Sequence, residues 1–327
     1  MPLNVQVLLA SAEQPTSLAE LRRAAGLPPQ TTMRSHLRAL TELRVLERSR
    51  AAGFPNAGEY SLTQSGRGLV VLINLLQAWL NTAPEGPVPI GSAAAKNAIK
   101  AFVEGWSSTL VRALAARPLA LTELDRLINT LNYPSLERRL VAMRLSGLIE
   151  PYESGGRANP YVVTPWLRRA IGPLAAAALW ELQQGFLRSA PFGRVDVEAV
   201  FLLSVPLVEF SGSLSGSCQL VVEIPSGEST KSSGALVKLR NGRVESCVSS
   251  LESTPDSWAS GSSAAWLRAI VMDEASELAL GGDSSVVTEL VQGLHGALFD
   301  RRRFVSSGTG SGAKDDGRHA PSGAREM

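Results

Sequence analysis

The chain has 327 residues, of which 44% are hydrophobic and 19% charged, and its formal net charge is +2. This length exceeds one ordinary hydrophobic core and predicts two or three globular domains. The near-neutral total neither favours nor excludes a nucleic-acid partner, and two cysteines are too few for a disulfide framework.

The charges are unevenly distributed along the chain. Residues 1–81 carry 8 Lys/Arg and 5 Asp/Glu, residues 82–188 carry 12 and 8, and residues 189–299 carry 6 and 13. A basic front and an acidic back predict that any polyanion binds at the front.

The sequence gives no sign of export or of a membrane span. The start MPLNVQVLLASAEQ has no basic leader before its apolar run, and the apolar stretch at 69–80 is too short to cross a bilayer. We expect a cytoplasmic protein with no membrane partner.

An internal repeat organises the first 188 residues. LAEL at 18–21 recurs as LTEL at 121–124, an offset of 103, and the same offset brings Leu37 onto Leu140. After a loop that is two residues shorter in the second copy, Trp79 corresponds to Trp180. We predict one module used twice, at residues 1–81 and 93–188, joined by a Pro/Gly-rich linker at 82–92.

Both copies predict the same order of elements. A leading helix and a short helix come first, and then a turn with proline, an arginine-containing helix, a strand–tip–strand hairpin and a long apolar helix. The expected ranges are 2–13 and 93–116 for the leading helices, 19–25 and 122–128 for the short helices, and 63–81 and 164–188 for the long helices. This order is the winged-helix plan.

Residues of the second copy form a motif that runs from the short helix to the long helix. They are Leu121, Glu123, Leu124, Leu136, Arg139, Leu140, Met143, Gly147, Leu148, Ile149, Tyr161, Val163, Thr164 and Trp180. With these residues the second copy resembles the HxlR-type winged-helix family of bacterial transcriptional regulators. The first copy resembles it more loosely, although it keeps the family's Thr–Gly ending in SLTQSGRGL at 61–69. Pro151 and PWLRR depart from the pattern in the second copy, and the upstream cysteine is absent. The resemblance implies a transcriptional regulator whose partner is double-stranded DNA.

A helical wheel separates a buried seam from a possible DNA-reading face in each arginine-containing helix. Met33, Leu37 and Leu40, and likewise Leu136, Leu140 and Met143, share the inner face. The candidate DNA-binding residues are Thr31, Thr32, Arg34, Ser35 and Arg38 in the first copy, Ser135, Arg138 and Arg139 in the second, and Arg48, Arg50 and Arg157 on the wings.

Two alternatives stay open for these copies. Glu42 and Glu137 lie close to the reading faces and would repel phosphate, so the first alternative is that one copy reads DNA while the other packs against a partner. The long apolar helices predict a homodimer, and the alternative is that they pack the two copies together within one chain.

Residues 197–299 predict an α+β domain, so the whole chain is placed in the α+β class. Gly212–Ile224 alternates as a strand does, residues 234–253 form a hairpin around Asn241-Gly242, and a strand, a helix, a strand and a closing helix at 284–299 follow. Residues 300–327 are rich in Ser, Gly and charge and predict a disordered tail.

This succession is similar to the sterol-carrier-protein-type domain. The likeness rests on Leu236-Val237-Lys238-Leu239 with Asn241-Gly242, on Pro255-Asp256, Ser260-Gly261 and Ala265-Trp266-Leu267, and on residues 278–283. It implies a small hydrophobic ligand, for which Trp258, Trp266, Leu267, Ile270 and Leu290 are candidate wall residues; ordinary core packing is the alternative for each.

No catalytic constellation is recognisable, so we predict a protein that is not an enzyme and needs no cofactor or metal. GSLSG at 212–216 lacks the serine of a nucleophile elbow, and GTGSG at 308–312 lies in the polar tail. Cys218 and Cys247 would allow a redox switch if they lay on neighbouring strands. The sequence therefore predicts a DNA-binding regulator modulated by a hydrophobic ligand. The alternatives are a tandem winged-helix scaffold that does not touch DNA, and a lipid-carrier or enzymatic role for the back domain.

Overall fold

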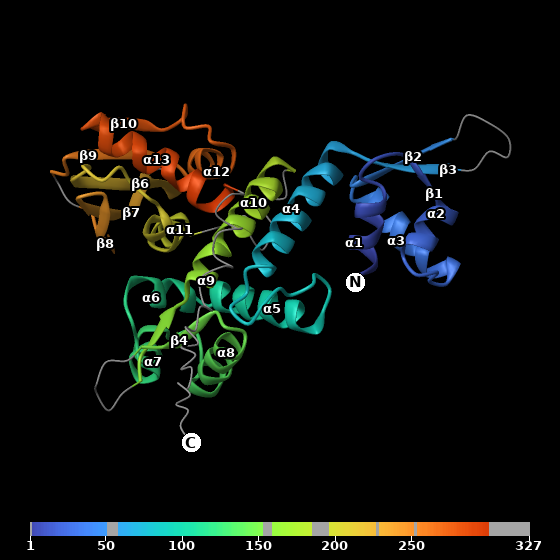
Figure 1. Cartoon of the computed structure of the whole chain (residues 1–327), viewed down its shortest axis with the longest axis horizontal. Helices are drawn as coiled ribbons and strands as arrows, with labels where there is room; N and C mark the ends of the chain where they lie inside the picture. Colours follow the sequence, from blue (N-terminus) through green and yellow to red (C-terminus); the bar gives the residue numbers. More distant parts are fainter. Residues whose placement is uncertain are drawn as a thin grey trace, which may run out of the picture.

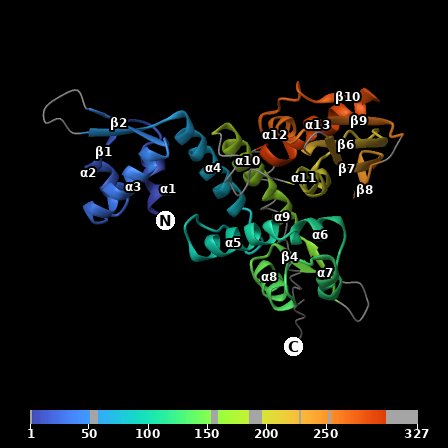
Figure 2. The same ribbon diagram turned by 180° about the vertical axis from the view of Figure 1, so that it is seen from behind.

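The computed structural model describes residues 2–50, 58–152, 159–184, 196–226, 229–251 and 254–300. Helices and strands form three units, which we call the front unit (residues 2–81), the middle unit (93–184) and the back unit (196–300). Figure 1 shows the front unit at one end of the molecule, reached through α4, while the middle and back units lie together at the other end. The view from behind in Figure 2 shows the same arrangement. The predicted tail lies almost wholly outside the described residues.

The front unit has the predicted order of elements. These are α1 (Leu3–Ala10), β1 (Thr16–Ser17), α2 (Leu18–Ala24), α3 (Gln30–Glu42), β2 (Leu46–Arg50), β3 (Gly58–Leu62) and α4 (Gln64–Leu80). The strands pair antiparallel in the order β1-β3-β2. Thr63 caps α4 by accepting the Gly66 N–H at 3.1 Å. A Cβ on Gly66 would lie 2.2 Å from the Val45 carbonyl oxygen, so only glycine lets α4 start this close to β2.

The middle unit follows the predicted order with two helix breaks that the sequence pattern did not predict, and it has an isolated bridge between Leu119 and Tyr161 where the front unit has β1. Its elements are α5 (Ala93–Ser107), α6 (Leu110–Ala116), α7 (Leu121–Leu127), α8 (Tyr133–Leu145), β4 (Ile149–Pro151), β5 (Tyr161–Val163), α9 (Pro165–Arg169) and α10 (Ile171–Gln183). The predicted helix 93–116 is interrupted at Thr109, which takes a φ of 60°. The predicted helix 164–188 is interrupted at Ala170, because Pro173 has no N–H to bond to the preceding turn.

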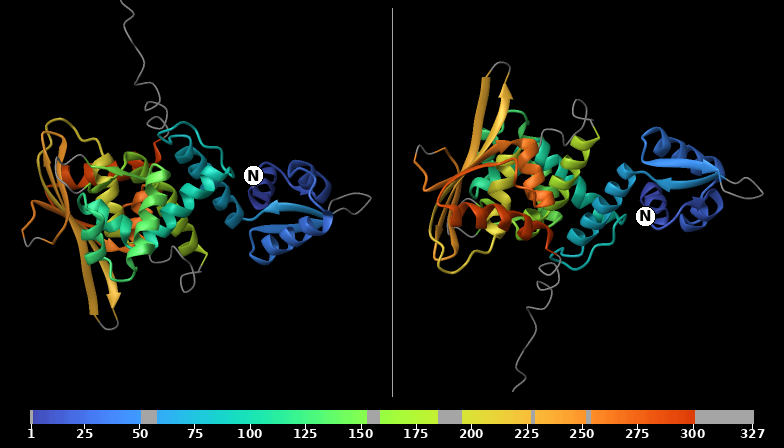
Figure 3. Two further views of the ribbon diagram at one scale, coloured as in Figure 1. Left: turned by 90° about the horizontal axis from the view of Figure 1, so that it is seen from below. Right: turned by 90° about the horizontal axis from the view of Figure 1, so that it is seen from above.

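The back unit is a sheet with helices on one face, as expected for the α+β class. It contains α11 (Val197–Ser204), the 3-10 turn η1 (Val205–Leu207), β6 (Gly216–Ser226), β7 (Ser229–Arg240), β8 (Arg243–Ser249), β9 (Ser257–Ser262), α12 (Ser263–Met272), β10 (Ala279–Gly282) and α13 (Ser284–Phe299). The strand order is β10-β9-β6-β7-β8, with β9 parallel to β6. Figure 3 shows this sheet at the outer edge of the molecule with the helices on its inner side.

In the back unit, one prediction from the sequence is confirmed and another is wrong. Asn241-Gly242 forms the predicted hairpin turn, and both residues have positive φ. Cys218 on β6 and Cys247 on β8 each pair with Val237 of β7, so the idea that they lie on neighbouring strands was wrong. Two strand spacings of ~4.8 Å separate them, which is too far for a disulfide. The helix α11 before the strands was also not predicted.

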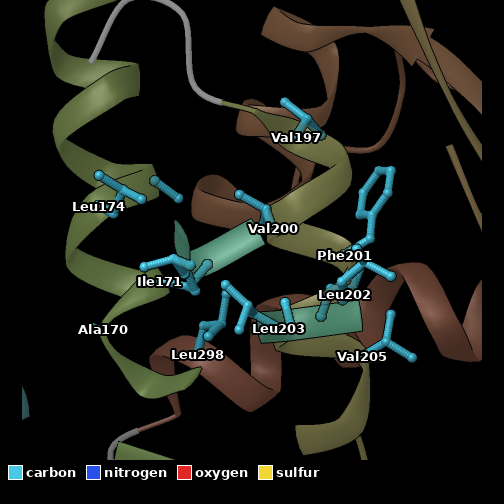
Figure 4. Close-up of a cluster of buried hydrophobic side chains, with 14 of the residues drawn as sticks. Ala170, Ile171, Leu174, Val197, Val200, Phe201, Leu202, Leu203, Val205 and Leu298 are labelled. Atoms are coloured by element: carbon cyan, nitrogen blue, oxygen red, sulfur yellow. The ribbon is translucent and has the colours of Figure 1, made fainter. Parts of the chain in front are cut away.

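The main hydrophobic core joins the middle and back units and includes the C-terminal end of α4 from the front unit. This cluster of buried residues runs from Trp79 and Leu80 through the middle unit to Leu298, and a second cluster lies among the other elements of the front unit. Figure 4 shows the joint, where Ile171 and Leu174 of α10 meet Val200 and Leu203 of α11. The long apolar helices α4 and α10 pack against each other within the chain (Figure 1).

Candidate nucleic-acid interface

The helix α3 presents the predicted polar face to solvent. Pro29 precedes its first turn, and Met33, Leu37 and Leu40 are buried against the rest of the front unit, as the helical wheel predicted. The predicted contact residues on the opposite side are all exposed: Thr31, Thr32, Arg34, Ser35 and Arg38.

A groove of about 820 Å³ runs between α2, α3 and the hairpin of the front unit. Four arginines line it from three different elements, namely Arg22, Arg34, Arg38 and Arg48. Glu42 is the single acidic residue among the described residues along the groove. Cations gathered from several elements give this concave surface a positive potential suited to a polyanion.

The hydrogen bonds of these arginines leave them able to take a phosphate or a base edge. Arg22 Nε donates to the Pro28 carbonyl at 3.1 Å, and Arg38 Nε donates to Glu42 Oε1 at 2.8 Å in an exposed pair. Such a pair contributes only ~0.5 kcal/mol, so a phosphate can replace the carboxylate. Arg48 lies 6.0 Å from the centroid of the Tyr60 ring, and Arg34 has no ion-pair partner within the described ranges.

Two members of this groove were not singled out from the sequence. Arg22 lies on the short helix before the turn, and Tyr60 lies on β3 opposite Arg48. Only the folded hairpin fixes the register that places Arg48 directly across from Tyr60, so the sequence contained no local signal for Tyr60. It contained none for Arg22 either, because the neighbouring Arg23 has the same charge and only the fold turns Arg22 into the groove.

The predicted residues of the middle unit do not gather in the same way. Arg138 is exposed and lines a cavity of about 720 Å³ beside α5 and residues 83–88. Arg139 instead donates from Nη1 to the Glu104 carbonyl of α5 at 3.0 Å, and Ser135 is half-buried near the N-terminus of α8. The side chain of Arg50 and the whole of Arg157 lie outside the described residues.

The five candidate ligand-wall residues are divided between the two faces of the back sheet. Trp266, Leu267 and Ile270 of α12 and Leu290 of α13 are buried on the helical side of the sheet. Trp266 Nε1 donates to the Val221 carbonyl at 2.8 Å. Trp258 points from β9 to the opposite face and is 38% exposed. The structure therefore brings four of the five residues together in packed interior and separates Trp258 from them.

A buried polar cluster joins the middle unit to the back unit. Glu198 of α11 accepts hydrogen bonds from Ser233 and Ser249, and Arg112 of α6 pairs with Glu198 at 3.0 Å and with Asp196. Nearby, Arg168 of α9 donates from Nη1 to the Leu202 carbonyl at 2.9 Å and to the Leu203 carbonyl at 3.3 Å. A cation at the C-terminus of α11 is favoured by the helix dipole, so Arg168 fastens α11 to the middle unit.

Neither a metal site nor a membrane span is found in the described part of the chain. Among those residues, no three His, Cys, Asp or Glu side chains gather in an arrangement able to hold a metal ion. In the same ranges, no helix is both long and apolar enough to cross a membrane.

Comparison with known proteins agrees with the geometry of the front unit. Residues 4–85 match the HxlR-like helix-turn-helix family, so an HxlR-type helix-turn-helix domain is present there. The match falls on the copy whose motif agreement was the looser one, and it covers less than half of the chain. A search of curated proteins gave no match. A domain of this type indicates a DNA-binding transcriptional regulator.

Proposed function

We propose that this chain is a transcriptional regulator that binds double-stranded DNA through the groove of its HxlR-type front unit, and that a small hydrophobic ligand in the back unit modulates this binding. The observation that carries the proposal is the set of four arginines along α2, α3 and β2. Arg34 and Arg38 lie on α3, the helix that a helix-turn-helix domain inserts into the major groove, and the other two arginines lie on either side of it.

Each part of the groove has a distinct role in this proposal. Arg34 and Arg38 project from the exposed face of α3, where they can donate to guanine O6 and N7. Thr31, Thr32 and Ser35 can reach base edges or phosphates from the same face. Arg48 on the wing strand can donate to a flanking phosphate, and the same role is proposed for Arg50 from its sequence position alone.

The test begins with selection of preferred sites from random duplex DNA by the purified full-length chain. The affinity for the selected site is then measured by fluorescence anisotropy for the wild type and for the double variant Arg34→Ala/Arg38→Ala. We expect the variant to lose about tenfold or more in affinity, and its salt slope to fall by about 2 if both arginines contact phosphate. The variant Arg240→Ala/Arg243→Ala removes the same charge from the back unit and serves as the matched control.

The outcome also separates the competing function. If the selection returns no preferred site, the chain is better described as a winged-helix scaffold that binds protein partners. If both double variants lose affinity equally, general electrostatic attraction replaces specific reading by α3.

Packing supports a route from the back unit to the DNA-binding unit. The helix α10 contacts α11, α12 and α13 on one side and α4 on the other, and α4 leads directly into the hairpin of the front unit. A ligand that enlarges the interior around Trp266, Ile270 and Leu290 would push on α10 and so change the position of α4. Such a ligand, of fatty-acid or sterol type, is what a sterol-carrier-like back unit would bind.

The ligand part has its own measurement. Palmitate and cholesterol are added to the full-length chain, and the thermal midpoint and the affinity for the selected DNA are recorded. We expect one of them to raise the midpoint, because a ligand that binds only the folded state stabilises it, and to change the DNA affinity. Stabilisation without any change in DNA affinity would assign the back unit a carrier role instead.

A homodimer, which the sequence predicted from its long apolar helices, would need surfaces other than the one shared by α4 and α10. These two helices cover each other within a single chain. The second winged helix, predicted for residues 93–188, supplies α10 to this contact.

A further inference from the structure

Two equivalent hydrogen bonds relate the front and middle units by an approximate two-fold symmetry. Trp79 Nε1 of α4 donates to the Trp166 carbonyl at 2.9 Å, and Trp180 Nε1 of α10 donates to the Ser65 carbonyl at 3.0 Å. Trp79 and Trp180 are 101 positions apart, and so are Ser65 and Trp166. A contact repeated with the partners exchanged is the signature of a two-fold interface between subunits. Here both sides belong to one chain.

The buried positions of α3 and α8 fix how the two helices correspond. Met33, Leu37 and Leu40 are buried in α3, and Leu136, Leu140 and Met143 are buried in α8, each 103 positions later. The strands that follow keep this offset, because Leu46 begins β2 and Ile149 begins β4. Exposed residues of the two units can therefore be compared position by position.

The arginines of the front groove are absent from the corresponding positions of the middle unit. In order, the replacements are Arg22 by Asp125, Arg34 by Glu137, Arg38 by Val141, and Arg48 by Pro151. Four arginines contribute +4, whereas Asp125 and Glu137 contribute −2 and the other two residues are neutral. The carboxylates of Asp125 and Glu137 would repel the phosphate backbone of DNA.

The exposed surface of α8 has also become apolar where α3 carries an ion pair. Arg38 and Glu42 correspond to Val141 and Leu145, which are 49% and 81% exposed. A phosphate placed against these side chains would lose water without gaining a hydrogen bond in return. The remaining exposed arginines of α8, Arg138 and Arg144, correspond to Ser35 and Thr41, so they do not restore the front pattern.

From these observations we infer that, among the units that the structure describes, the front unit reads the DNA sequence, and that the middle unit occupies the position of a second subunit without contacting bases. This inference rests on the proposed function. It narrows the DNA partner to a site with one asymmetric sequence element for each bound chain, and it removes Ser135, Arg138 and Arg139 from the reading residues.

The experiment compares matched double variants of the full-length chain on the DNA selected by the wild type. We expect Arg34→Ala/Arg38→Ala to lose about tenfold or more in affinity, and Arg138→Ala/Arg144→Ala to stay within about twofold. Circular dichroism of each variant checks that it is folded. Mass photometry of the complex, combined with the selected sequences, counts the sequence elements for each bound chain, and we expect one.

The possible outcomes distinguish a failure of this inference from a failure of the proposed DNA-binding function. If the wild type selects no DNA, the proposed function fails and the inference falls with it. If the wild type selects DNA but the α8 variant loses as much affinity as the α3 variant, the inference alone is wrong. Two sequence elements for each bound chain would overturn it in the same way.

Discussion

The front and middle units share the order of a leading helix, a short helix, an arginine-containing helix, a hairpin and a closing helix, although the middle unit divides its leading and closing helices and has no counterpart of β1 among the described strands. They differ more in what surrounds them. The front unit has its own small core and an exposed cationic groove. The middle unit shares its core with the back unit and fastens α11 through Arg112 and Arg168. The comparison teaches that buried positions preserve the fold, while exposed positions are free to change from a DNA-facing surface to a different one.

The largest expected effect comes from the joint that both units share. Trp79 is buried, stacks on Trp166 with ring centroids 4.6 Å apart and donates one hydrogen bond across the joint. We expect Trp79→Ala to lower the free energy of unfolding by about 3–5 kcal/mol, because a large cavity forms and the Trp166 carbonyl loses its donor. Urea unfolding measures this. Trp258→Ala, which removes a tryptophan from an exposed face, serves as the control and should cost about 1 kcal/mol.

A smaller effect is expected at the joint that only the middle unit makes with the back unit. Arg112→Met leaves the buried carboxylate of Glu198 without its cation, which we expect to cost about 2 kcal/mol after allowance for the partial exposure of Arg112. The exposed pair of Arg117 and Glu123 gives the matched control, and Arg117→Met should change stability by less than ~0.5 kcal/mol. Equal losses in the two variants would show that the buried cluster does not hold the units together.

The N-caps of α2 and α7 offer a smaller contrast between the two copies. Ser17 accepts the Glu20 N–H, and Glu20 accepts the Ser17 N–H in return, whereas Ala120 has no side-chain oxygen and keeps only the bond from its N–H to Glu123. We expect Ser17→Ala to cost about 1 kcal/mol and Ala120→Ser to gain up to about 1 kcal/mol in thermal unfolding. A loss on adding the serine would mean that the new hydroxyl loses water at the buried position of Ala120 without accepting the Glu123 N–H.

The cap of α2 also has a defined pH dependence. Hydrogen bonds from the backbone and side chain of Ser17 hold the pKa of Glu20 below its ordinary value of 4.5. The contribution of Glu20 is therefore present above that value and is lost as the pH falls through the lower folded pKa. Ser17→Ala should make thermal stability of the front unit less sensitive to acid, and an unchanged profile would contradict this.

The last prediction concerns the reactivity of Cys247, which lies at the joint of the middle and back units, and involves no change in stability. Burial raises the pKa of its thiol to about 12, although the nearby Arg168 opposes the shift. Because the thiolate reacts, we expect alkylation by iodoacetamide at pH 8 to be about a hundredfold or more slower than in the unfolded chain, and to accelerate as the pH rises. Mass spectrometry of the labelled peptide measures the rate. Rapid labelling of the native chain would show that this joint opens.

Much of the fold could be predicted from local pattern. The buried stripes of α3 and α8, the turn at Asn241-Gly242 and the closing elements of the back unit follow from periodicity and turn chemistry. The interruptions at Thr109 and Ala170 were missed, because hydrophobic periodicity continues across them. α11 was missed as well, since a short helix that is buried on all sides shows no amphipathic stripe.

The sequence by itself determined the order of elements in the front unit, the buried faces of α3 and α8, and a resemblance to the HxlR-type family that was specific in residues 93–188 and looser in residues 1–81. Only the tertiary structure decided that Arg22 and Arg48 join Arg34 and Arg38 in one groove, that Arg139 bonds to α5, and that α4 meets α10 within the chain. The physical reason is range: helical stripes and turns depend on residues a few positions apart, whereas a groove or a joint depends on contacts between residues that packing alone brings together.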